Sequence, residues 1–318
     1  MSKPREEEVS RLDEAARAGW LYYVAGNTQE EIAGKLGLSR QSVQRLVSLS
    51  MSAGLVRVRI DHPIAACLDL GARLKARFGL AYAEVVPSDP ASGSTTLGIA
   101  QACADELERR LLSPVPIILA IGTGRTLKAA VEHLPATIRC PQHRIVSLTG
   151  NVAPDGSAAL YNVIFSMADR VEAPHYPMPL PVVVSSAQER ALLHEQKVIR
   201  STLALAAQAD TSFVGVGEIG PQTPLLLDRF IGREEEEEIA RAGAVGEICG
   251  WIFGADGRII DCAFNERVAS APLPSTARGT VIGVAMGAAK RPALRAALGA
   301  LLNGVITDET TARSLLED

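Results

Sequence analysis

One glycine between two short helical patterns is the feature that most restricts how this chain can fold. Each pattern places its apolar residues on one helical face: Ile32, Ala33 and Leu36 in the first, and Val43, Leu46 and Val47 in the second. Gly37 lies between them, where the end of a helix favours a left-handed residue, and Ser39 follows as an N-cap for the second helix. The segment is therefore predicted to form two short helices joined by a tight turn.

The spacing of three residues in this segment meets the packing demands of a DNA-binding helix-turn-helix. With Gln29 as the first position, Ala33 is fifth, Gly37 is ninth and Val43 is fifteenth. A small residue lets the two helices cross closely, glycine allows the turn, and a branched apolar residue fills the space between the helices. The pattern thus indicates a nucleic-acid-binding unit near the N-terminus.

The outer face of the second predicted helix is polar and basic. We predict that eight residues contact DNA: Thr28, Gln29, Ser39, Arg40, Gln41, Ser42, Gln44 and Arg45. Arginine and glutamine can pair with guanine and adenine edges in the major groove, and residues at the start of the supporting helix can bind phosphate. Residues 28–60 contain five basic and two acidic residues, a net charge of +3 in a chain whose net charge is −4. This contrast favours an anionic partner, with a solvated helical hairpin as the alternative.

Beyond Pro63 the chain alternates between β-rich apolar runs and helical patterns, the first of which ends near Phe78. The predicted strands are Ala81–Val86, Val115–Ile121, Arg144–Leu148, Pro181–Val184, Ser212–Val216, Glu247–Phe253 and Val281–Val284. The predicted helices are Thr96–Leu112, Arg125–His133, Ala158–Arg170, Glu189–Ala209, Glu234–Ala242, Arg291–Leu301 and Asp308–Leu316. Such alternation is typical of a parallel sheet covered by helices on both faces, so we expect an α/β fold with a doubly wound parallel sheet.

Two domains follow from this division of the chain. Residues 1–60 are expected to form the DNA-binding domain, and residues 61–318 a larger domain for effector binding and oligomerisation. Within the first domain, a helix near Ser10–Val24 can cover the helix-turn-helix. The alternation VRVRI at Val56–Ile60 predicts a short strand, which would make this domain winged-helix-like.

Glycine-containing loops follow several predicted strands, and in a parallel sheet ligands bind at the carboxyl ends of strands near helix N-termini. From these loops we predict the following effector-binding residues: Gly122, Thr123, Gly124, Arg125, Thr126, Gly150, Asn151, Gly217, Glu247 and Lys290. The GTGRT loop at residues 122–126 can hold a phosphate through its amides and hydroxyls, with a tight structural turn as the alternative. Its spacing matches neither common nucleotide-binding motif, which favours another polar, phosphate-tolerant ligand.

Catalytic, metal-binding and membrane functions find little support in the sequence. The five histidines lie in unrelated contexts, although Lys128 or Lys290 could form an imine with an open-chain sugar. Five scattered cysteines without a C-x-x-C pair predict small buried thiols in a reducing cytosol and no metal. The most apolar run, residues 280–289, is much shorter than a membrane span of about 18 residues, and the N-terminus has no signal-peptide core. We expect a cytoplasmic protein without cofactor or catalytic residues.

The helix-turn-helix pattern and the glycine-containing loops together resemble the SorC family of bacterial transcriptional regulators. The resemblance extends over nearly the whole chain, from Trp20 to Leu316. The resemblance is carried by YYVAGNTQEEIAGKLGLSRQSVQRLVSLSMSAGLVRVRI, GTGRT, SLTGN, GVGEIG, GEICGWIF and GVAMGAAKRPALRAALGALLNGVITDETTARSLL. The opening WLYYVAG is similar to the erythritol-type regulators of that family. The chain departs from the family pattern at Glu247, where aspartate is usual, and at Met286-Gly287, where two glycines are usual.

The resemblance implies a sugar-binding domain related to sugar-phosphate isomerases, without retained catalysis, in tetramers on operator DNA. It also implies that a sugar or polyol phosphate releases or reshapes DNA binding. We therefore predict a homo-oligomeric regulator, a dimer or tetramer, that represses a carbohydrate catabolic operon. The alternative is a sugar-phosphate isomerase-like enzyme with a fused DNA-binding head, in which Glu218 or Glu247 would be the base.

Overall fold

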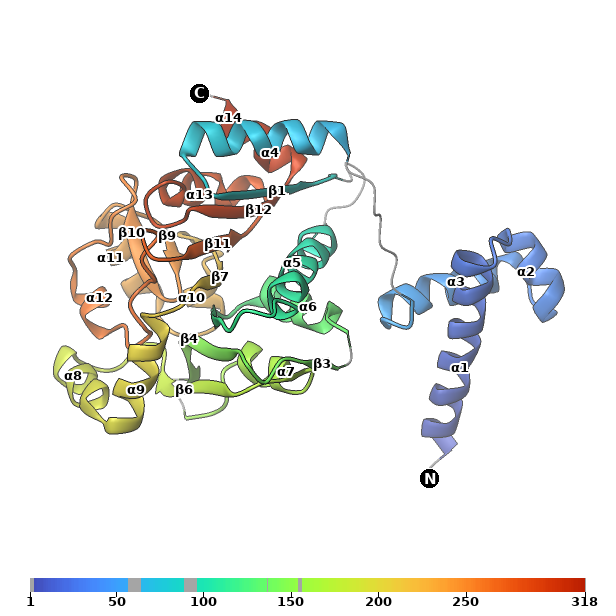
Figure 1. Ribbon diagram of the computed structural model, residues 1–318, viewed down its shortest axis with the longest axis horizontal. Helices are drawn as coiled ribbons and strands as arrows, with labels where there is room; N and C mark the ends of the chain where they lie inside the picture. The colour runs from blue at the N-terminus through green and yellow to red at the C-terminus, as the bar shows by residue number, and fades with distance from the viewer. Residues whose placement is uncertain (1–2, 57–63, 89–95, 136, 154–155, 318) are drawn as a thin grey trace. The chain divides into compact units, whose positions relative to one another are not determined.

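The computed structural model describes residues 3–56, 64–88, 96–135, 137–153 and 156–317 (Figure 1). The chain divides into two compact units, Met1–Pro63 and Ile64–Asp318, which we call the head and the body. Each unit has a hydrophobic core of its own. The predicted domain boundary between residues 60 and 61 lies outside the described residues, as does the predicted wing beyond Val56.

Four helical segments form the described part of the head: α1 (Lys3–Gly19), η1 (Trp20–Val24), α2 (Gln29–Leu36) and α3 (Arg40–Ser52). Gly37 ends α2 with a φ of 65°, the left-handed conformation expected of the turn. Ile32, Val43 and Val47 are buried between the helices, as their spacing predicted. The predicted helix-turn-helix is therefore confirmed. The covering helix starts earlier than predicted, and its last five residues form a π-helical turn.

A parallel sheet of seven strands forms the centre of the body. In spatial order its strands are β1 (Tyr82–Val86), β12 (Gly304–Asp308), β11 (Thr280–Val284), β7 (Thr211–Gly215), β2 (Ile118–Ile121), β4 (Arg144–Val152) and β6 (His175–Pro181). Every neighbouring pair in this order is parallel. The predicted α/β class and parallel sheet are confirmed.

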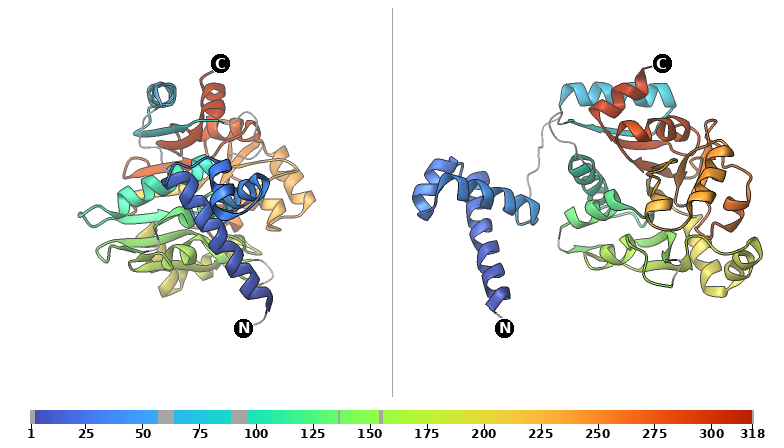
Figure 2. Two further views of the ribbon diagram at one scale, coloured as in Figure 1. Left: turned by 90° about the vertical axis from the view of Figure 1, so that its right-hand side faces the viewer. Right: turned by 180° about the vertical axis from the view of Figure 1, so that it is seen from behind.

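Helices cover both faces of this sheet (Figures 1 and 2). One core cluster joins the sheet to α4 (Ala65–Phe78), α9 (Lys197–Ala206), α13 (Arg291–Ala297) and α14 (Glu309–Leu316). A second cluster joins it to α5 (Thr96–Leu111), α6 (Arg125–His133) and α7 (Val163–Ala168). Because each face is buried, the central strands are apolar on both sides, which explains their nearly continuous hydrophobic runs.

The order of the strands reverses between β2 and β7. From β2 the chain adds β4 and then β6 toward one edge, whereas β7 returns to the other side of β2 and is followed outward by β11 and β12. The loops after β2 and β7 therefore leave the same end of the sheet in opposite directions. Such a point of reversal opens a crevice at the carboxyl ends of the strands.

The prediction of a single strand over Glu247–Phe253 is wrong. The chain turns at Cys249 and Gly250, whose φ values are 54° and 87°. The turn produces β9 (Ala244–Ile248) and β10 (Trp251–Gly254), which pair antiparallel in a separate sheet with β8 (Gly217–Glu218). A continuous apolar run cannot reveal such a turn, because a cysteine gives no sign of a left-handed backbone.

Two strands of the main sheet differ from those predicted. β6 spans His175–Pro181 rather than Pro181–Val184, and its three prolines occupy alternate positions. An edge strand tolerates this pattern because a proline nitrogen needs no partner on the open side. The strand β12 was missed, although all five of its residues are buried. Its brevity and its place directly before an expected helix concealed it. A further pair of two-residue strands, β3 (Ile138–Arg139) and β5 (Val171–Glu172), was also missed.

Three predicted helices are shorter in the structure, and one of them, predicted over Arg291–Leu301, ends at Ala297. The helix predicted over Glu189–Ala209 is divided at Gln196 into α8 (Ala187–Glu195) and α9. Only α9 buries apolar residues against the sheet, whereas α8 buries none of its residues, so the two segments do not share one face. The helix predicted over Ala158–Arg170 contracts to α7. Smaller helices complete the body: α10 (Pro224–Leu227), α11 (Arg233–Arg241), α12 (Ala263–Arg267) and η2 (Ala288–Lys290).

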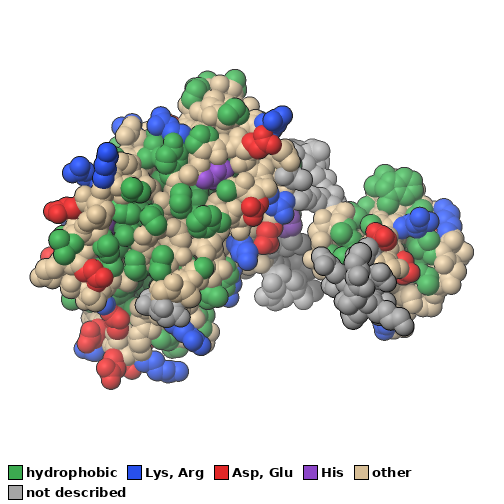
Figure 3. Space-filling model, turned by 90° about the horizontal axis from the view of Figure 1, so that it is seen from below, with side chains coloured by type: hydrophobic (Ala, Val, Ile, Leu, Met, Phe, Trp, Pro, Cys, Tyr) green, Lys and Arg blue, Asp and Glu red, His purple; other side chains and the backbone are tan. Residues whose placement is uncertain are grey.

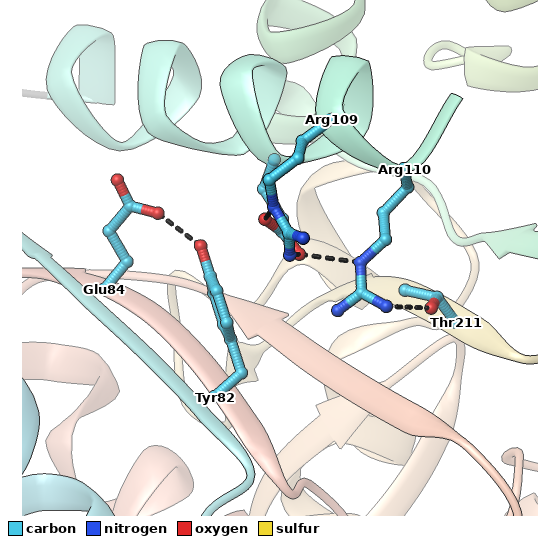
Figure 4. A network of polar contacts seen from close by, with 6 residues as sticks. Tyr82, Glu84, Arg109, Arg110 and Thr211 are labelled. Carbon is cyan, nitrogen blue, oxygen red and sulfur yellow. Dashed lines mark hydrogen bonds and ion pairs between the residues drawn. The ribbon is translucent and has the colours of Figure 1, made fainter. Parts of the chain in front are cut away.

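A polar network fastens α5 to the sheet at the amino ends of the strands (Figure 4). Glu106 is only 3% exposed, and its carboxylate accepts hydrogen bonds from Arg109 and Arg110. Arg110 Nη1 also donates to Thr211 Oγ1 at 3.2 Å, at the first residue of β7. Both arginines are paired with the Glu106 carboxylate, so the network is a structural clamp at the end of the sheet opposite the strand carboxyl ends.

Among the described residues, no helix combines the length and apolar character needed to cross a bilayer.

Gly150 should be a position where any side chain weakens the sheet. A Cβ atom there would lie 2.3 Å from Leu180 O in β6, a contact with backbone that cannot rotate away. We expect Gly150→Ala to lower the free energy of unfolding by about 1–3 kcal/mol in urea titration. The matched control is Gly232→Ala, where a Cβ meets nothing within 4 Å and the change should stay within about 0.5 kcal/mol. Equal stability of the two variants would contradict the observed approach of β4 to β6.

Candidate functional site

The start of each helix in the helix-turn-helix is closed by a side-chain cap. Thr28 and Glu31 form a capping box, in which Thr28 N donates to Glu31 Oε2 at 2.8 Å and Glu31 N donates to Thr28 Oγ1 at 3.3 Å. Ser39 Oγ accepts from Ser42 N at 3.1 Å. Two of the residues predicted to contact DNA, Thr28 and Ser39, therefore already serve to fix the ends of α2 and α3.

The outer face of α3 is exposed. Arg40, Gln41, Gln44 and Arg45 all lie at the surface, whereas Ser42 is half-buried. Val43, Leu46 and Val47 point into the head core and fix the rotation of the helix. The arrangement presents two guanidinium groups and two amides on one face, as a recognition helix requires.

In the body, the GTGRT loop occupies the point where the strand order reverses. Gly122 N donates to Phe213 O of β7 at 2.8 Å, which joins the two diverging strands. A Cβ at Gly122 would lie 3.1 Å from Cys249 Sγ, so a side chain there would crowd the turn between β9 and β10. Gly124 has a φ of 126° and begins α6 without a side-chain cap. The first backbone N–H groups of α6 are thus open to an anion.

The two threonines of this loop are not equivalent. Thr123 Oγ1 donates a hydrogen bond to Tyr161 O, in the chain segment before α7, at 2.5 Å. This hydroxyl therefore has no second proton to donate to a ligand. Thr126 lies in the first turn of α6 and is half-buried. Arg125, between them, is exposed. Of the two hydroxyls that the sequence offered to a phosphate, the structure leaves Thr126 as the better donor.

A cluster of charged residues lies beside the loop, on the small antiparallel sheet and at η2. Lys290 Nζ donates to Val216 O at 2.8 Å and lies 3.8 Å from Glu218 Oε2. Glu247 Oε2 accepts from Gly250 N at 2.9 Å. A Cβ at Gly217 would lie 2.3 Å from Glu247 Oε1, so this glycine makes room for the carboxylate. Three of the predicted residues, Gly217, Glu247 and Lys290, are therefore brought together.

The carboxyl groups of this cluster lie in a poorly solvated place. Burial raises the pKa of Glu247, and the nearby Asp228 and Glu218 carboxylates add to this effect, while Gly250 N–H and Lys290 oppose it. Burial also raises the pKa of Asp228, with Arg125 acting in the opposite direction. Glu218 Oε2 is buried without a hydrogen-bond partner. These oxygens can accept hydrogen bonds from hydroxyl groups of a ligand.

Two residues of the site were missed from the sequence, Asp228 and Cys249. Asp228 follows a four-residue helix and belongs to no motif, so only the folded chain brings it near Arg125 and Glu247. Cys249 adopts a strained left-handed backbone beside Gly122. Burial raises the pKa of its thiol to about 12, so Cys249 stays protonated at neutral pH and is no nucleophile.

Gly150 and Asn151 have structural roles at the end of β4. Gly150 allows β6 to approach, and Asn151 is a buried residue whose carbonyl accepts from Ala159 N. Nearby, the Thr149 hydroxyl oxygen is buried at the end of β4 and makes no hydrogen bond. In the described parts of the chain, no group of three or more histidine, cysteine or acidic residues is arranged to hold a metal ion.

Comparison with known proteins gives consistent relatives over the whole chain. Residues 62–317 match the Sugar-bind family of sugar-binding domains. The chain is 34% identical over 303 residues to the erythritol catabolism regulatory protein EryD of Brucella abortus, covering 95% of this chain and 96% of that protein. It is 34% identical over 319 residues to the transcriptional regulator LsrR of an Enterobacter species, covering 98% and 93%. The full-length sorbitol operon regulator SorC of Klebsiella pneumoniae has a similar structure, with a TM-score of 0.70 at 25% identity and coverage of 96% and 99%.

A helix-turn-helix head followed by an α/β body whose strand order reverses defines a class, the transcriptional regulators with a sugar-binding domain. Within that class, the chain belongs to the SorC family, and its body belongs to the Sugar-bind family. The resemblance to the SorC family inferred from the sequence motifs is confirmed, and the role of transcriptional regulator with it.

Ionised Glu247 should destabilise the ligand-free body at neutral pH. Its pKa is raised in the folded state, so its cost is absent below the pKa of the unfolded chain and complete above that of the folded chain. Glu247→Gln should therefore raise the free energy of unfolding at pH 7.5 by about 0.5–2 kcal/mol, with a smaller gain at pH 5. Urea titration at both pH values measures this, with the exposed Glu237→Gln as the control. A gain that grows toward pH 5 would reverse the assigned direction.

Proposed function

We propose that the chain represses a carbohydrate-catabolism operon by binding operator DNA with its head, and that a phosphorylated sugar or polyol bound to its body controls this activity. The single observation that carries the proposal is the strand reversal, which brings the uncapped start of α6 together with Gly217, Glu247 and Lys290. Two relatives named for erythritol catabolism and for the sorbitol operon support a polyol as the effector.

The two compact units have separate proposed roles. We assign DNA binding to residues 1–60 and effector binding and oligomerisation to residues 61–318. On the head, Arg40, Gln41, Gln44 and Arg45 are the residues that read base edges. Thr28, Gln29, Ser39 and Ser42 lie at the helix starts, where backbone amides and hydroxyls suit DNA phosphates.

The effector has two chemical parts that match two parts of the site. A phosphate dianion fits the first turn of α6, with the positive end of the helix dipole, the Thr126 hydroxyl and the Arg125 guanidinium. The hydroxyl groups of a sugar or polyol fit the carboxylates of Glu218 and Glu247, which accept hydrogen bonds. Lys290 lies between the carboxylates and can shift to the ligand, since its present partners are a carbonyl oxygen and a Glu218 oxygen 3.8 Å away.

We propose that the protein is a homo-oligomer, a dimer or tetramer, which brings two or more heads to one operator. A single small head binds DNA weakly, and linked heads gain by effective concentration. Apolar surface for self-association is present on the face of the body that carries α7 to α9 (Figure 3). There Leu160, Phe165, Leu192 and Val198 are each more than half exposed.

Arg45→Ala should remove operator preference without unfolding the head, because Arg45 is exposed on α3 and makes no contact with the head core. Loss of one bidentate base contact costs about 1–3 kcal/mol per half-site. Competition of a selected operator against random DNA in gel-shift assays measures this. Arg17→Ala, an exposed arginine on α1, is the control and should retain full preference. If Arg45→Ala still discriminates operator from random DNA, α3 is not the recognition helix.

Thr126→Val should weaken binding of a phosphorylated polyol about tenfold and leave binding of the same polyol without phosphate unchanged. The variant removes one donor to the dianion, a charge-assisted hydrogen bond. Isothermal titration calorimetry with polyols of four to six carbons, each with and without phosphate, provides the measurement. Thr310→Val is the control, because Thr310 is exposed on α14. Undiminished phosphopolyol affinity in Thr126→Val would place the phosphate elsewhere.

A further inference from the structure

The loop that carries Lys290 is fastened to a helix outside the ligand site. This loop, residues 285–290, follows β11 and contains Gly287, whose φ of 107° favours glycine. Gly287 N donates to Thr311 Oγ1 at 2.8 Å. Thr311 lies in the first turn of α14, and its side chain is 3% exposed. One buried hydroxyl thus joins the effector loop to α14.

The start of α14 is itself rigidly held. Asp308 at the end of β12 caps the helix, with its Oδ1 accepting from Thr311 N at 3.1 Å. Its Oδ2 accepts from Ser88 Oγ at 2.5 Å, and Ser88 Oγ accepts from Thr310 N at 3.0 Å. Asp308 itself is 3% exposed, so its bond to Thr311 N is shielded from water. If Gly287 moves, it therefore pulls on a helix end that is fixed by hydrogen bonds.

From α14 the packing continues to α4, the first helix of the body. Ala312 and Leu315 belong to the same buried cluster as Leu70 and Leu74 of α4. At the far end of the pair, Arg77 Nη1 donates to Leu316 O at 2.8 Å. The two helices lie side by side in Figures 1 and 2. In the sequence, residues 57–64 alone separate α4 from the described part of the head.

We infer that Thr311 is a positioning residue that couples the effector loop to α4, and through α4 to the chain segment that leads to the head. The inference rests on the proposed function, because it describes how the proposed effector site is regulated. A ligand that draws the Lys290 ammonium away from Val216 O would pull on the loop that carries this residue. Close-packed elements transmit such a shift because they do not deform continuously.

Hydrogen–deuterium exchange on the ligand-free full-length protein tests the connection without needing the effector. Thr311→Val removes the acceptor of Gly287 N–H, so exchange at Gly287 should rise about tenfold. If Thr311 connects the loop to α4, amides of α4 should also exchange faster, by about threefold. Amides of α5, which packs on the opposite face of the sheet, should be unchanged.

Two further variants keep the result decisive. Thr311→Ser retains the hydroxyl and should restore exchange at Gly287 and α4 to wild-type rates, whereas exposed Thr310→Val should alter neither. Faster exchange at Gly287 alone would overturn the inference, since the hydroxyl would then hold the loop without reaching α4. Equal acceleration in α4 and α5 would also overturn it, because a general loss of stability would explain both. An unchanged exchange rate at Gly287 would overturn the inference as well, because the Thr311 hydroxyl would then not hold the loop.

The consequence for regulation is measured separately, with erythritol 4-phosphate as the probe and operator affinity as the readout. Thr311→Val should keep ligand-free operator affinity and lose at least half of the fold-change that the probe causes in the wild type. Full retention of that response would overturn the regulatory role of Thr311. If the probe does not bind the wild type, that choice of effector fails, while the exchange measurement still decides whether Thr311 links the loop to α4.

Discussion

The hydrogen bond from Gly122 N to Phe213 O, 2.8 Å long, joins the two strands between which the sheet reverses its order. The proposed ligand site depends on this bond, because it brings the start of α6 beside the end of β7 and the small sheet that follows. The absence of a side chain at Gly122 is what lets Cys249 approach, and Cys249 in turn carries the strained turn that orients Glu247. Backbone geometry therefore assembles the site, and the charged side chains occupy positions that it creates.

The site differs from the clamp at the other end of the sheet in how its charges are matched. At the clamp, two arginines surround one carboxylate, and each oxygen of Glu106 accepts a close hydrogen bond (Figure 4). At the strand reversal, the pKa values of Asp228 and Glu247 are raised, and Glu218 Oε2 has no hydrogen bond and only a long ion pair, 3.8 Å, with Lys290. Unsatisfied groups of this kind cost stability unless a ligand pairs with them, so they favour a binding role over a structural one.

Much of the fold could be predicted because its signals are local. Gly37, Val43 and the caps at Thr28 and Ser39 lie within one short segment, and each acts on its own neighbours. The parallel sheet follows from alternation along the chain. What could not be predicted depends on tertiary context: the prolines of β6 conceal an edge strand, and the turn at Cys249 needs a conformation that its residue type disfavours. Likewise Asp228, which directly follows α10, comes near Arg125 and Glu247 only in the folded chain, and the Thr123 hydroxyl donates to Tyr161 O from a distant part of the sequence.

The separation into two units limits how any ligand can act on DNA. The head has its own buried core, so a molecule bound in the body cannot alter the recognition helix by repacking it. In the proposed oligomer, a ligand would instead act on the probability that two heads meet DNA in register, a quantity set by the elements to which the heads are attached. The element next to the head in the chain is α4, which packs on α14, and α14 holds the loop of Lys290 through Thr311. The proposed control of effective concentration would need a stiff path from the ligand site to α4, to which the hydrogen bonds of Asp308 and Thr311 would contribute.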